Sequence, residues 1–215
     1  NEGGPVVDMG PYYITALVTL LGAVKSVTSK SKKVFLEREI GIGPRKGKKF
    51  KVECDTTYVS TLEFKNNSLI QMTLSFDVKD HKRNHIELYG DKGSIVVPDP
   101  NMFGGSVFTC LGLGEKWTEH ETHNLELGKI NIKSQSSRAN ESPTNANYRG
   151  AGLSEMAYSI ENKNKHMCNG ELSLHVLDII QSIMKSAKSR KTELLSTQCD
   201  TPKQFTQDII KKILK

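Results

Sequence analysis

The stretch from Leu69 to Val78 constrains the fold of this chain more than any other. Two sets of side chains alternate along it, a fully apolar set and a mostly polar one: Ile70, Met72, Leu74, Phe76 and Val78, and Leu69, Gln71, Thr73, Ser75 and Asp77. A period of two places the sets on opposite sides of a β-strand. The stretch therefore predicts a sheet with one buried apolar face and one mostly polar face.

More strands are predicted around this one. Residues 56–64 precede it across the short turn 65–67, which predicts a hairpin. Residues 85–100 form a second hairpin, with its turn at Gly90, Asp91, Lys92 and Gly93. Residues 24–40 are rich in β-branched side chains and predict one long or two short strands, and residues 105–113 and 116–127 predict further strands.

Helices are predicted at the two ends of the chain. Pro11 suits the first position of a helix that Gly22 ends. Apolar side chains at helical spacing predict two later helices: Leu153, Met156, Ala157 and Ile160 in one, and Leu172, Val176, Ile179, Ile183 and Ala187 in the other. Residues 201–204 resemble a capping box, with proline at the first position of a last helix.

The order of these elements is helix, strands, then helices. Strands that do not alternate with helices favour an α+β fold, with a large open, mainly antiparallel sheet and helices packed on one face. The segment 127–149 is polar and predicts a long loop of the kind that is usually functional or mobile. The chain of 215 residues is long enough for one large domain, spanning 1–215.

Composition excludes several classes of protein. The chain contains 36 % hydrophobic and 25 % charged residues, which fits a globular protein. Its longest apolar run, residues 14–21, is too short to span a bilayer, and no signal peptide is indicated. Four widely spaced cysteines favour free thiols in a reducing cytoplasm. The net charge is +6, but the basic segment 43–51 lacks stacking aromatics and is interpreted as a solvated loop rather than a nucleic-acid site.

Four segments together resemble a known family. They read GGPVVDMGPYY (3–13), SFDVKDHKRNHIELYGDKGSIVVPDPNMFGG (75–105), YRGAGLSEMAYSI (148–160) and NGELSLHVLDIIQSIMKSA (169–187). Their order is similar to that in the second half of the Gfo/Idh/MocA oxidoreductases, the relatives of sugar and inositol dehydrogenases. The resemblance covers essentially the whole chain and implies the C-terminal domain of such an enzyme.

This resemblance also implies what else the full-length protein contains. Family members carry an N-terminal dinucleotide-binding domain that uses NAD or NADP, and a catalytic lysine in an E-K-P motif. This sequence contains neither a G-x-G-x-x-G loop nor an E-K-P motif. We therefore expect that the dinucleotide-binding domain is absent from this chain, that the chain alone binds no NAD or NADP, and that it is inactive alone.

The family's catalytic signature in this region is an aspartate followed four residues later by a histidine. Asp8 matches the aspartate, but the fourth residue on is Tyr12. Histidine, with a pKa near 6.5, exchanges protons at neutral pH, whereas tyrosine, near 10, mostly does not. The resemblance thus implies catalytic positions for Asp8 and Tyr12, with Tyr12 donating a hydrogen bond to a substrate oxygen. The alternative for Asp8 is a cap or dipole partner of the following helix.

Four more residues are candidates for binding substrate. Tyr13 adjoins Tyr12, and one of the two rings is expected to pack in the core. His81 lies just past a predicted strand end, where binding residues gather; the alternative is an exposed histidine. Arg149 either binds a substrate oxygen or carboxylate or braces the loop before it. His175 lies on an apolar stripe, and a buried histidine with a structural hydrogen bond is the alternative there.

The remaining expectations concern metals, partners and function. His120, Glu121 and His123 cluster on an apparent strand, which indicates a solvated edge and no metal site. The resemblance implies a sugar-like or polyol substrate, hydride transfer to or from a nicotinamide, and a homo-oligomer through the sheet face. We expect no nucleic acid and no membrane as partners. The alternative function is a non-enzymatic scaffold or sensor of the same fold, which Tyr12 favours.

Overall fold

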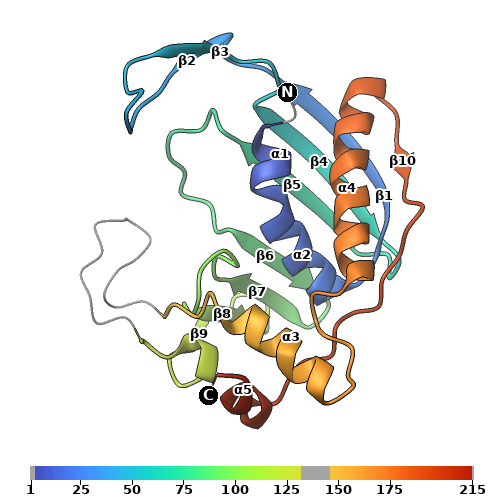
Figure 1. The fold of residues 1–215 in the computed structure, drawn as a ribbon. Coiled ribbons are helices and arrows are strands. Elements are labelled where there is room, and N and C mark those ends of the chain that lie inside the picture. The colour runs from blue at the N-terminus through green and yellow to red at the C-terminus, as the bar shows by residue number, and fades with distance from the viewer. Residues whose placement is uncertain (1–2, 132–145, 215) are drawn as a thin grey trace. The chain divides into compact units, whose positions relative to one another are not determined.

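The computed structural model describes residues 3–131 and 146–214. These residues form two compact units. The first unit comprises Asn1–His81 with Asn169–Pro202, and the second comprises Lys82–Cys168 with Lys203–Lys215. Each unit combines helices with antiparallel strands (Figure 1), so the predicted α+β class is confirmed.

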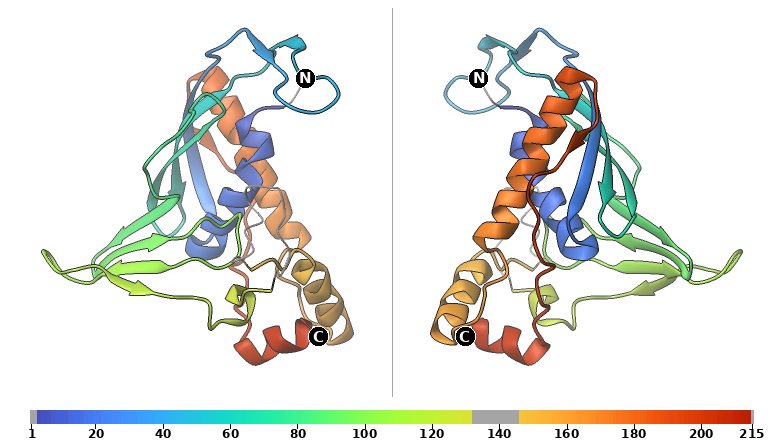
Figure 2. Two further views of the ribbon diagram at one scale, coloured as in Figure 1. Left: turned by 90° about the vertical axis from the view of Figure 1, so that its left-hand side faces the viewer. Right: turned by 90° about the vertical axis from the view of Figure 1, so that its right-hand side faces the viewer.

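The first unit is a sheet covered by helices on one face. The sheet has the order β10-β1-β4-β5, formed by Glu193–Leu194, Val24–Lys32, Thr57–Phe64 and Leu69–Ser75. Helices α1 (Pro5–Asp8), α2 (Gly10–Leu21) and α4 (Gly170–Ser189) pack on it, as the ribbon shows (Figures 1 and 2). Strand pairing is antiparallel throughout, which agrees with the predicted meander.

The apolar core of the first unit lies between this sheet and the helices. The alternation of β4 and β5 directs their apolar side chains to the same side, because Leu62 pairs with Ile70 across the two strands. Phe64, Ile14 and Ile179 are fully buried there. The predicted hairpin 56–78 and the predicted helix that ends at Gly22 are both confirmed.

The opposite face of this sheet is open and mixed in polarity. It carries alternate residues of β4. The structure selects Thr57, Val59, Thr61 and Glu63 for this face, because Tyr58, Ser60, Leu62 and Phe64 are buried. Lys30 pairs with Val59, and Thr73 of β5 pairs with Val59 from the other side.

A two-stranded ribbon extends from the first unit. Strand β2 (Glu37–Glu39) pairs with β3 (Lys49–Lys51), and the basic segment 43–51 forms the turn and the second strand. The expectation of a loop was therefore wrong for residues 49–51. All of Lys49–Lys51 is exposed, so the solvated character of the segment is confirmed. Within the described residues, strand β3 pairs with β2 alone.

The second unit contains a sheet of order β6-β7-β8-β9. Its strands are Ile86–Gly90, Gly93–Val97, Val107–Cys110 and Thr118–His120. The predicted hairpin at Gly90–Gly93 is confirmed. Gly93 has φ of 144°, and a Cβ built on it would lie 2.3 Å from the carbonyl oxygen of Cys110. Only glycine fits this close approach of two backbones.

One helix of the second unit begins later than the sequence predicts. Helix α3 (Ala151–Glu161) lies beside α5 (Gln207–Ile213), which also contacts the short helix η1 (Glu126–Gly128). The predicted helix forms, but its apolar stripe is exposed, with Leu153 at 70 % and Ile160 at 67 %. Helix α5 starts six residues after Thr201, because the Thr206 hydroxyl accepts the amide of Ile209 as its N-cap.

The predicted long loop lies partly outside the described residues, which resume at 146. Its two described flanks are joined by side-chain amide hydrogen bonds. Asn131 Nδ2 donates to the carbonyl oxygen of Asn147 at 2.8 Å, and the amide of Asn147 donates to Asn131 Oδ1 at 2.7 Å. These two bonds close the base of the loop.

Candidate functional site

The junction between α1 and α2 presents two of the predicted site residues. Pro5, Val6 and Gly10 are buried, so the junction is anchored on its inner side. Gly4 has φ of 113°, and a Cβ there would lie 3.1 Å from the carbonyl oxygen of Asp55, so the chain enters the junction close to the residues that precede β4. The inner contacts leave the outer side exposed.

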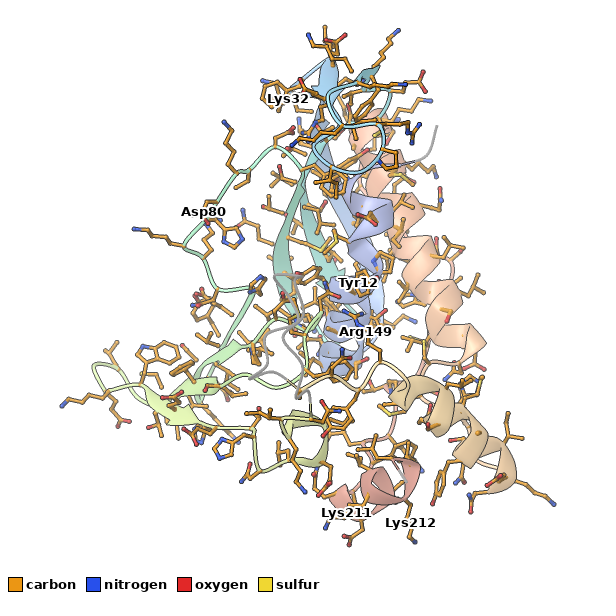
Figure 3. All side chains as sticks on the ribbon, turned by 60° about the vertical axis from the view of Figure 1, so that its left-hand side comes forward. Tyr12, Lys32, Asp80, Arg149, Lys211 and Lys212 are labelled. Carbon is orange, nitrogen blue, oxygen red and sulfur yellow. The ribbon has the colours of Figure 1, made fainter. Side chains whose placement is uncertain are left out.

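Asp8 and Tyr12 lie on that exposed side. Tyr12 is 48 % exposed, and Asp8, at the last position of α1, is also exposed. Figure 3 shows Tyr12 on α2. A carboxylate that accepts hydrogen bonds and a phenol that donates one are thus separated by one turn of chain and open to a ligand.

Two alternatives for these residues are now clarified. The N-cap of α2 is Met9, and no side chain caps it with a hydrogen bond, so Asp8 is not a hydrogen-bonding cap. The alternative of Asp8 as a partner of the helix dipole stays open, because Asp8 lies just before the start of α2. Tyr13 is half-buried and packs against the apolar core, whereas Tyr12 faces solvent. The expected division between one core ring and one exposed ring is confirmed.

His81 lies exposed in the loop that follows β5. Its amide donates to Asp80 Oδ1 at 2.8 Å, and Asp80 is seen on this loop in Figure 3. The position just past a strand end agrees with the prediction. Its substrate contact remains a prediction, because the exposed surroundings fit both interpretations.

A partly buried aspartate, Asp77, lies at the start of the His81 loop. Asp77 was expected on the open polar face, but it is covered, since Arg38 Nη2 of β2 donates to its Oδ1 at 2.5 Å. The hydroxyls of Thr56 and Thr57 donate to Asp77 Oδ2 at 2.7 and 2.6 Å. Burial raises the pKa of Asp77, but these bonds outweigh it and hold the pKa below its usual range. No local sequence pattern indicates this contact, because Arg38 and Asp77 are distant along the chain.

His175 lies fully buried between α4 and β1. Its Nε2 accepts the amide of Val24 at 2.9 Å, so Nδ1 carries the proton and donates to Thr197 Oγ1 at 2.9 Å. The Thr197 hydroxyl in turn donates to Asp178 Oδ2 at 2.8 Å. Burial lowers the pKa of His175, and the charge of Asp178 opposes this only partly. This geometry favours the structural interpretation of His175 over contact with a substrate.

Arg149 belongs to the second unit and precedes α3. Its side chain is exposed, and its amide donates to Asn147 Oδ1 at 3.4 Å. Asn147 also closes the base of the long loop. The segment immediately before Arg149 is therefore held in place by hydrogen bonds. The other predicted site residues all lie in the first unit. Contact of Arg149 with a substrate remains a prediction.

Two further expectations can be compared with the described parts of the chain. Within residues 3–131 and 146–214, no group of three or more His, Cys, Asp or Glu could hold a metal ion. His123 Nδ1 pairs with Glu121 at 3.1 Å, and both side chains are well exposed, as predicted for a solvated edge. In the same described ranges, no helix is long and apolar enough to cross a membrane.

One family model matches the chain. Residues 1–96 match the model of the GFO/IDH/MocA C-terminal domain. The matched segment contains α1, α2 and the strands from β1 to the first residues of β7, and therefore Asp8, Tyr12, Tyr13 and His81. No curated protein sequence matches the chain.

Several solved structures share the fold. An NAD-binding oxidoreductase from Klebsiella pneumoniae matches with a TM-score of 0.65 at 15 % identity, over 91 % of this chain and 52 % of that one. Levoglucosan dehydrogenase in complex with NADH and L-sorbose matches with 0.62 at 16 %, over 88 % and 49 %. An oxidoreductase from Agrobacterium radiobacter in complex with NAD+, L-tartaric acid and magnesium matches with 0.60 at 14 %, over 88 % and 48 %.

At such identities the likeness concerns the fold alone. The chain spans about half the length of each of these three structures. These matches therefore do not assign an activity to the whole protein that contains this chain. The exposed groups on α1 and α2 are the basis for a proposal.

Proposed function

Since residues 1–96 match the model of the GFO/IDH/MocA C-terminal domain, we propose that the chain is the substrate-binding and dimerisation domain of an NAD(P)-dependent oxidoreductase of that family. The substrate is a sugar-like or polyol molecule, a class that the L-sorbose complex among the similar structures supports. The three cysteines with partly buried side chains and the exposed Cys168 form no disulfide, which fits a cytoplasmic protein.

One observation carries this proposal. By the resemblance, Asp8 and Tyr12 correspond to the family's aspartate and histidine, and both are exposed on an anchored helical junction. Asp8 accepts a hydrogen bond from a substrate hydroxyl, and the Tyr12 phenol donates one to a substrate oxygen. Holding the reacting carbon in one orientation makes the reaction effectively intramolecular. The exposed His81 and Arg149 and the half-buried Tyr13 are retained as candidate substrate contacts. His175 is the weakest candidate, because it is fully buried.

The cofactor is assigned to another part of the protein. A nicotinamide cofactor accepts or supplies hydride at the substrate carbon in such enzymes. This sequence contains no glycine loop that would cradle a pyrophosphate at a helix N-terminus. We therefore expect that the 215-residue chain binds neither NAD nor NADP. Calorimetry with each dinucleotide checks this, and micromolar binding of either would contradict it.

The main test uses the full-length protein. Asp8→Ala is expected to lower turnover on its best polyol by about 10²- to 10⁴-fold, the usual value of a positioned acid–base group. Its free energy of unfolding should fall by no more than about 1 kcal/mol. Asp91→Ala, which removes an exposed carboxylate from the β6–β7 turn, is the matched control. If Asp8→Ala stays within a few fold of the unchanged protein, the site assignment is wrong.

The scaffold or sensor remains the second candidate, because Tyr12 replaces the family's histidine. It predicts a full-length protein that binds polyols without turning them over. Tyr12→His and Tyr12→Phe separate the two candidates. If only Tyr12→His reduces NAD(P)+ with a polyol, the natural chain is a binding protein. If the natural chain is active and Tyr12→Phe is slower, the phenol takes part in catalysis.

The open face of the first sheet is the proposed dimer interface. Thr61, Thr73 and Val59 lie together on it, and a mixed surface of this kind suits sheet-to-sheet packing across a two-fold axis. A specific interface should bury about 1,200–2,000 Å². Light scattering at micromolar concentration is expected to give a dimer that Thr61→Lys with Thr73→Lys dissociates. Thr118→Lys with Glu119→Lys, on the edge strand β9, is the control.

A further inference from the structure

A hollow on the sheet of the second unit has no role in the proposed function. Its volume is about 330 Å³, and six residues from β6, β7, β8 and their flanking segments line it: Asn84, Glu87, Tyr89, Val96, Phe108 and Trp117. This volume lies at the lower end of the range for small-molecule sites. None of the six residues belongs to the proposed substrate site on α1 and α2.

Strand register builds one side of the hollow. Glu87 pairs with Val96, and Val96 pairs with Phe108, so three adjacent strands place their side chains in one row. Tyr89 lies two residues after Glu87 and therefore on the same face of β6. The row is partly apolar, so it can contact an apolar face of a ligand.

Two aromatic side chains are unusually exposed here. Tyr89 is 74 % exposed, and Trp117, which immediately precedes β9, is 49 % exposed. An exposed aromatic ring offers a large, rigid apolar face at low conformational cost, together with a polar group on the same side chain. These rings therefore provide a surface on which apolar C–H groups can be buried.

The polar groups of the hollow are held in place before any ligand arrives. Asn84 Nδ2 donates to Glu87 Oε1 at 2.7 Å, and the Tyr89 hydroxyl donates to Glu87 Oε2. Each carboxylate oxygen retains a lone pair that can accept a further hydrogen bond. The side-chain amide oxygen of Asn84, Oδ1, is a further acceptor beside the Glu87 carboxylate. Hydroxyl groups of a ligand thus find acceptors beside the aromatic rings.

The charge balance favours a neutral ligand. The bonds from Tyr89 and Asn84 and the nearby charge of Arg83 hold the pKa of Glu87 below its usual range, so the carboxylate is ionised at neutral pH. Because Arg83 offsets that charge, an organic cation gains little net attraction in the hollow. A neutral polyhydroxylated ring gains from both the carboxylate and the aromatic faces.

We propose that this hollow binds a saccharide, with one apolar ring face against Tyr89 and Trp117 and with hydroxyls donating to Glu87 and Asn84. The occupant is one or two sugar rings, in keeping with the volume. The site does not depend on the proposed oxidoreductase activity, since it lies within the second unit and uses other residues. Its loss and the loss of activity can therefore be separated.

The sequence provides a direct readout, because Trp117 is the single tryptophan of the 215 residues. Its emission reports on the hollow alone. Titration of the chain with glucose, galactose and cellobiose is expected to change this emission saturably. Ligands of this size bind with a dissociation constant on the order of 1 mM. Calorimetry provides the same constant without relying on tryptophan.

Variants of the hollow sharpen the test. Tyr89→Ala should weaken the binding of cellobiose about tenfold or more, since it removes both the ring and the bond to Glu87. Tyr89→Phe retains the ring and should weaken binding less, which keeps the test informative if Tyr89→Ala does not fold. Glu87→Gln should also weaken binding. The matched controls are Phe50→Ala, an exposed aromatic of the first unit, and Glu115→Gln, an exposed carboxylate; both should bind as the unchanged chain does.

Three results would overturn the proposal. The first is no saturable change with any saccharide far above the millimolar range. The second is binding of tetramethylammonium in preference to the sugars, which would identify a cation site. The third is an emission shift that depends on protein concentration without ligand and disappears in Tyr89→Ala, which would show that a second copy fills the hollow.

Discussion

Helices α4 and α3 both carry apolar side chains at helical spacing, yet their surroundings differ. In α4, Ile179 and Ile183 are fully buried against the first sheet. In α3, Leu153 and Ile160 are exposed, and the buried side chains are Glu155 and Ser159. Glu155 Oε1 accepts the Ser159 hydroxyl at 2.8 Å, so the inner side of α3 is a hydrogen-bonded polar surface.

This difference shows that a periodic apolar stripe predicts a helix but not the burial of its apolar face. The spacing establishes that a helix forms and which side chains share a face, and both hold for α3 and α4. It does not establish what covers that face, which depends on elements distant in the sequence. For α4 the cover is β1, and within the described residues the stripe of α3 has no comparable cover.

Core substitutions test this comparison most strongly. Ile183→Ala in α4 should lower the free energy of unfolding by about 2–5 kcal/mol, because it removes a fully buried side chain and leaves a cavity. Ile160→Ala in α3 should change it by no more than about 0.5 kcal/mol. Urea denaturation of the chain measures both. An equal loss in the two variants would mean that the stripe of α3 is covered in solution.

Much of the fold follows from local patterns. The end of α2 at Gly22, the stripe of α4 and both hairpins were predicted, because turn residues and alternation act over a few positions. The start of α5 was wrong, since the Thr206 hydroxyl, rather than Thr201, accepts the capping amide. Strand β2 lies in the segment 24–40 that was predicted to form one long or two short strands, but β3 and its pairing with β2 were missed, because β3 is short and its residues are mostly charged.

The candidate site was predictable only in part. Exposure of Asp8 and Tyr12 follows from the buried residues around them, and the sequence places both at the same helical junction. The contact between Arg38 and Asp77 and the partners of His175 join residues far apart in the chain, so no local pattern reveals them. The sequence offered two interpretations of His175, and only the tertiary contacts favour one.

The partly buried carboxylate of Asp178 in α4 provides the next test. Asp178 Oδ2 accepts the amides of Ser196 and Thr197, both at 3.1 Å, as well as their hydroxyls. Asp178→Ala leaves these donors without their acceptor and should lower the free energy of unfolding by about 1–3 kcal/mol. Asp91→Ala, at an exposed turn, should have little effect. Equal losses in urea denaturation would show that the segment 196–197 finds other acceptors.

The pH dependence of stability should report on His175. Burial lowers its pKa in the folded chain, so the unfolded chain, with a pKa near 6.5, binds more protons below that pH. Stability should therefore fall as the pH decreases from about 6.5 towards the folded pKa, by about 1.4 kcal/mol for each unit between the two values. Carboxylates such as Asp178, whose pKa is lowered by hydrogen bonds from Thr197 and Ser196 that outweigh the opposing effect of burial, contribute only below about pH 4.

Two glutamine variants test whether His175 causes this pH dependence of stability. His175→Gln should be less stable at neutral pH but nearly independent of pH between about 4.5 and 6.5. His81→Gln, at an exposed position, should retain the slope of the unchanged chain. Thermal unfolding at several pH values measures both. A slope that persists in His175→Gln would assign the dependence to another group.

The smallest expected effect concerns the end of α4. Arg190 caps this helix in the left-handed region, with φ of 60° and ψ of 26°, and its amide donates to Ser186. A side chain is strained in this conformation, whereas glycine adopts it freely. Arg190→Gly should therefore raise the free energy of unfolding by about 0.5–1 kcal/mol. Lys188→Gly, two residues earlier on an exposed helical position, should lower it by about 1 kcal/mol. Opposite signs in urea denaturation would confirm the cap, and a loss in both variants would mean that Arg190 contributes through its side chain.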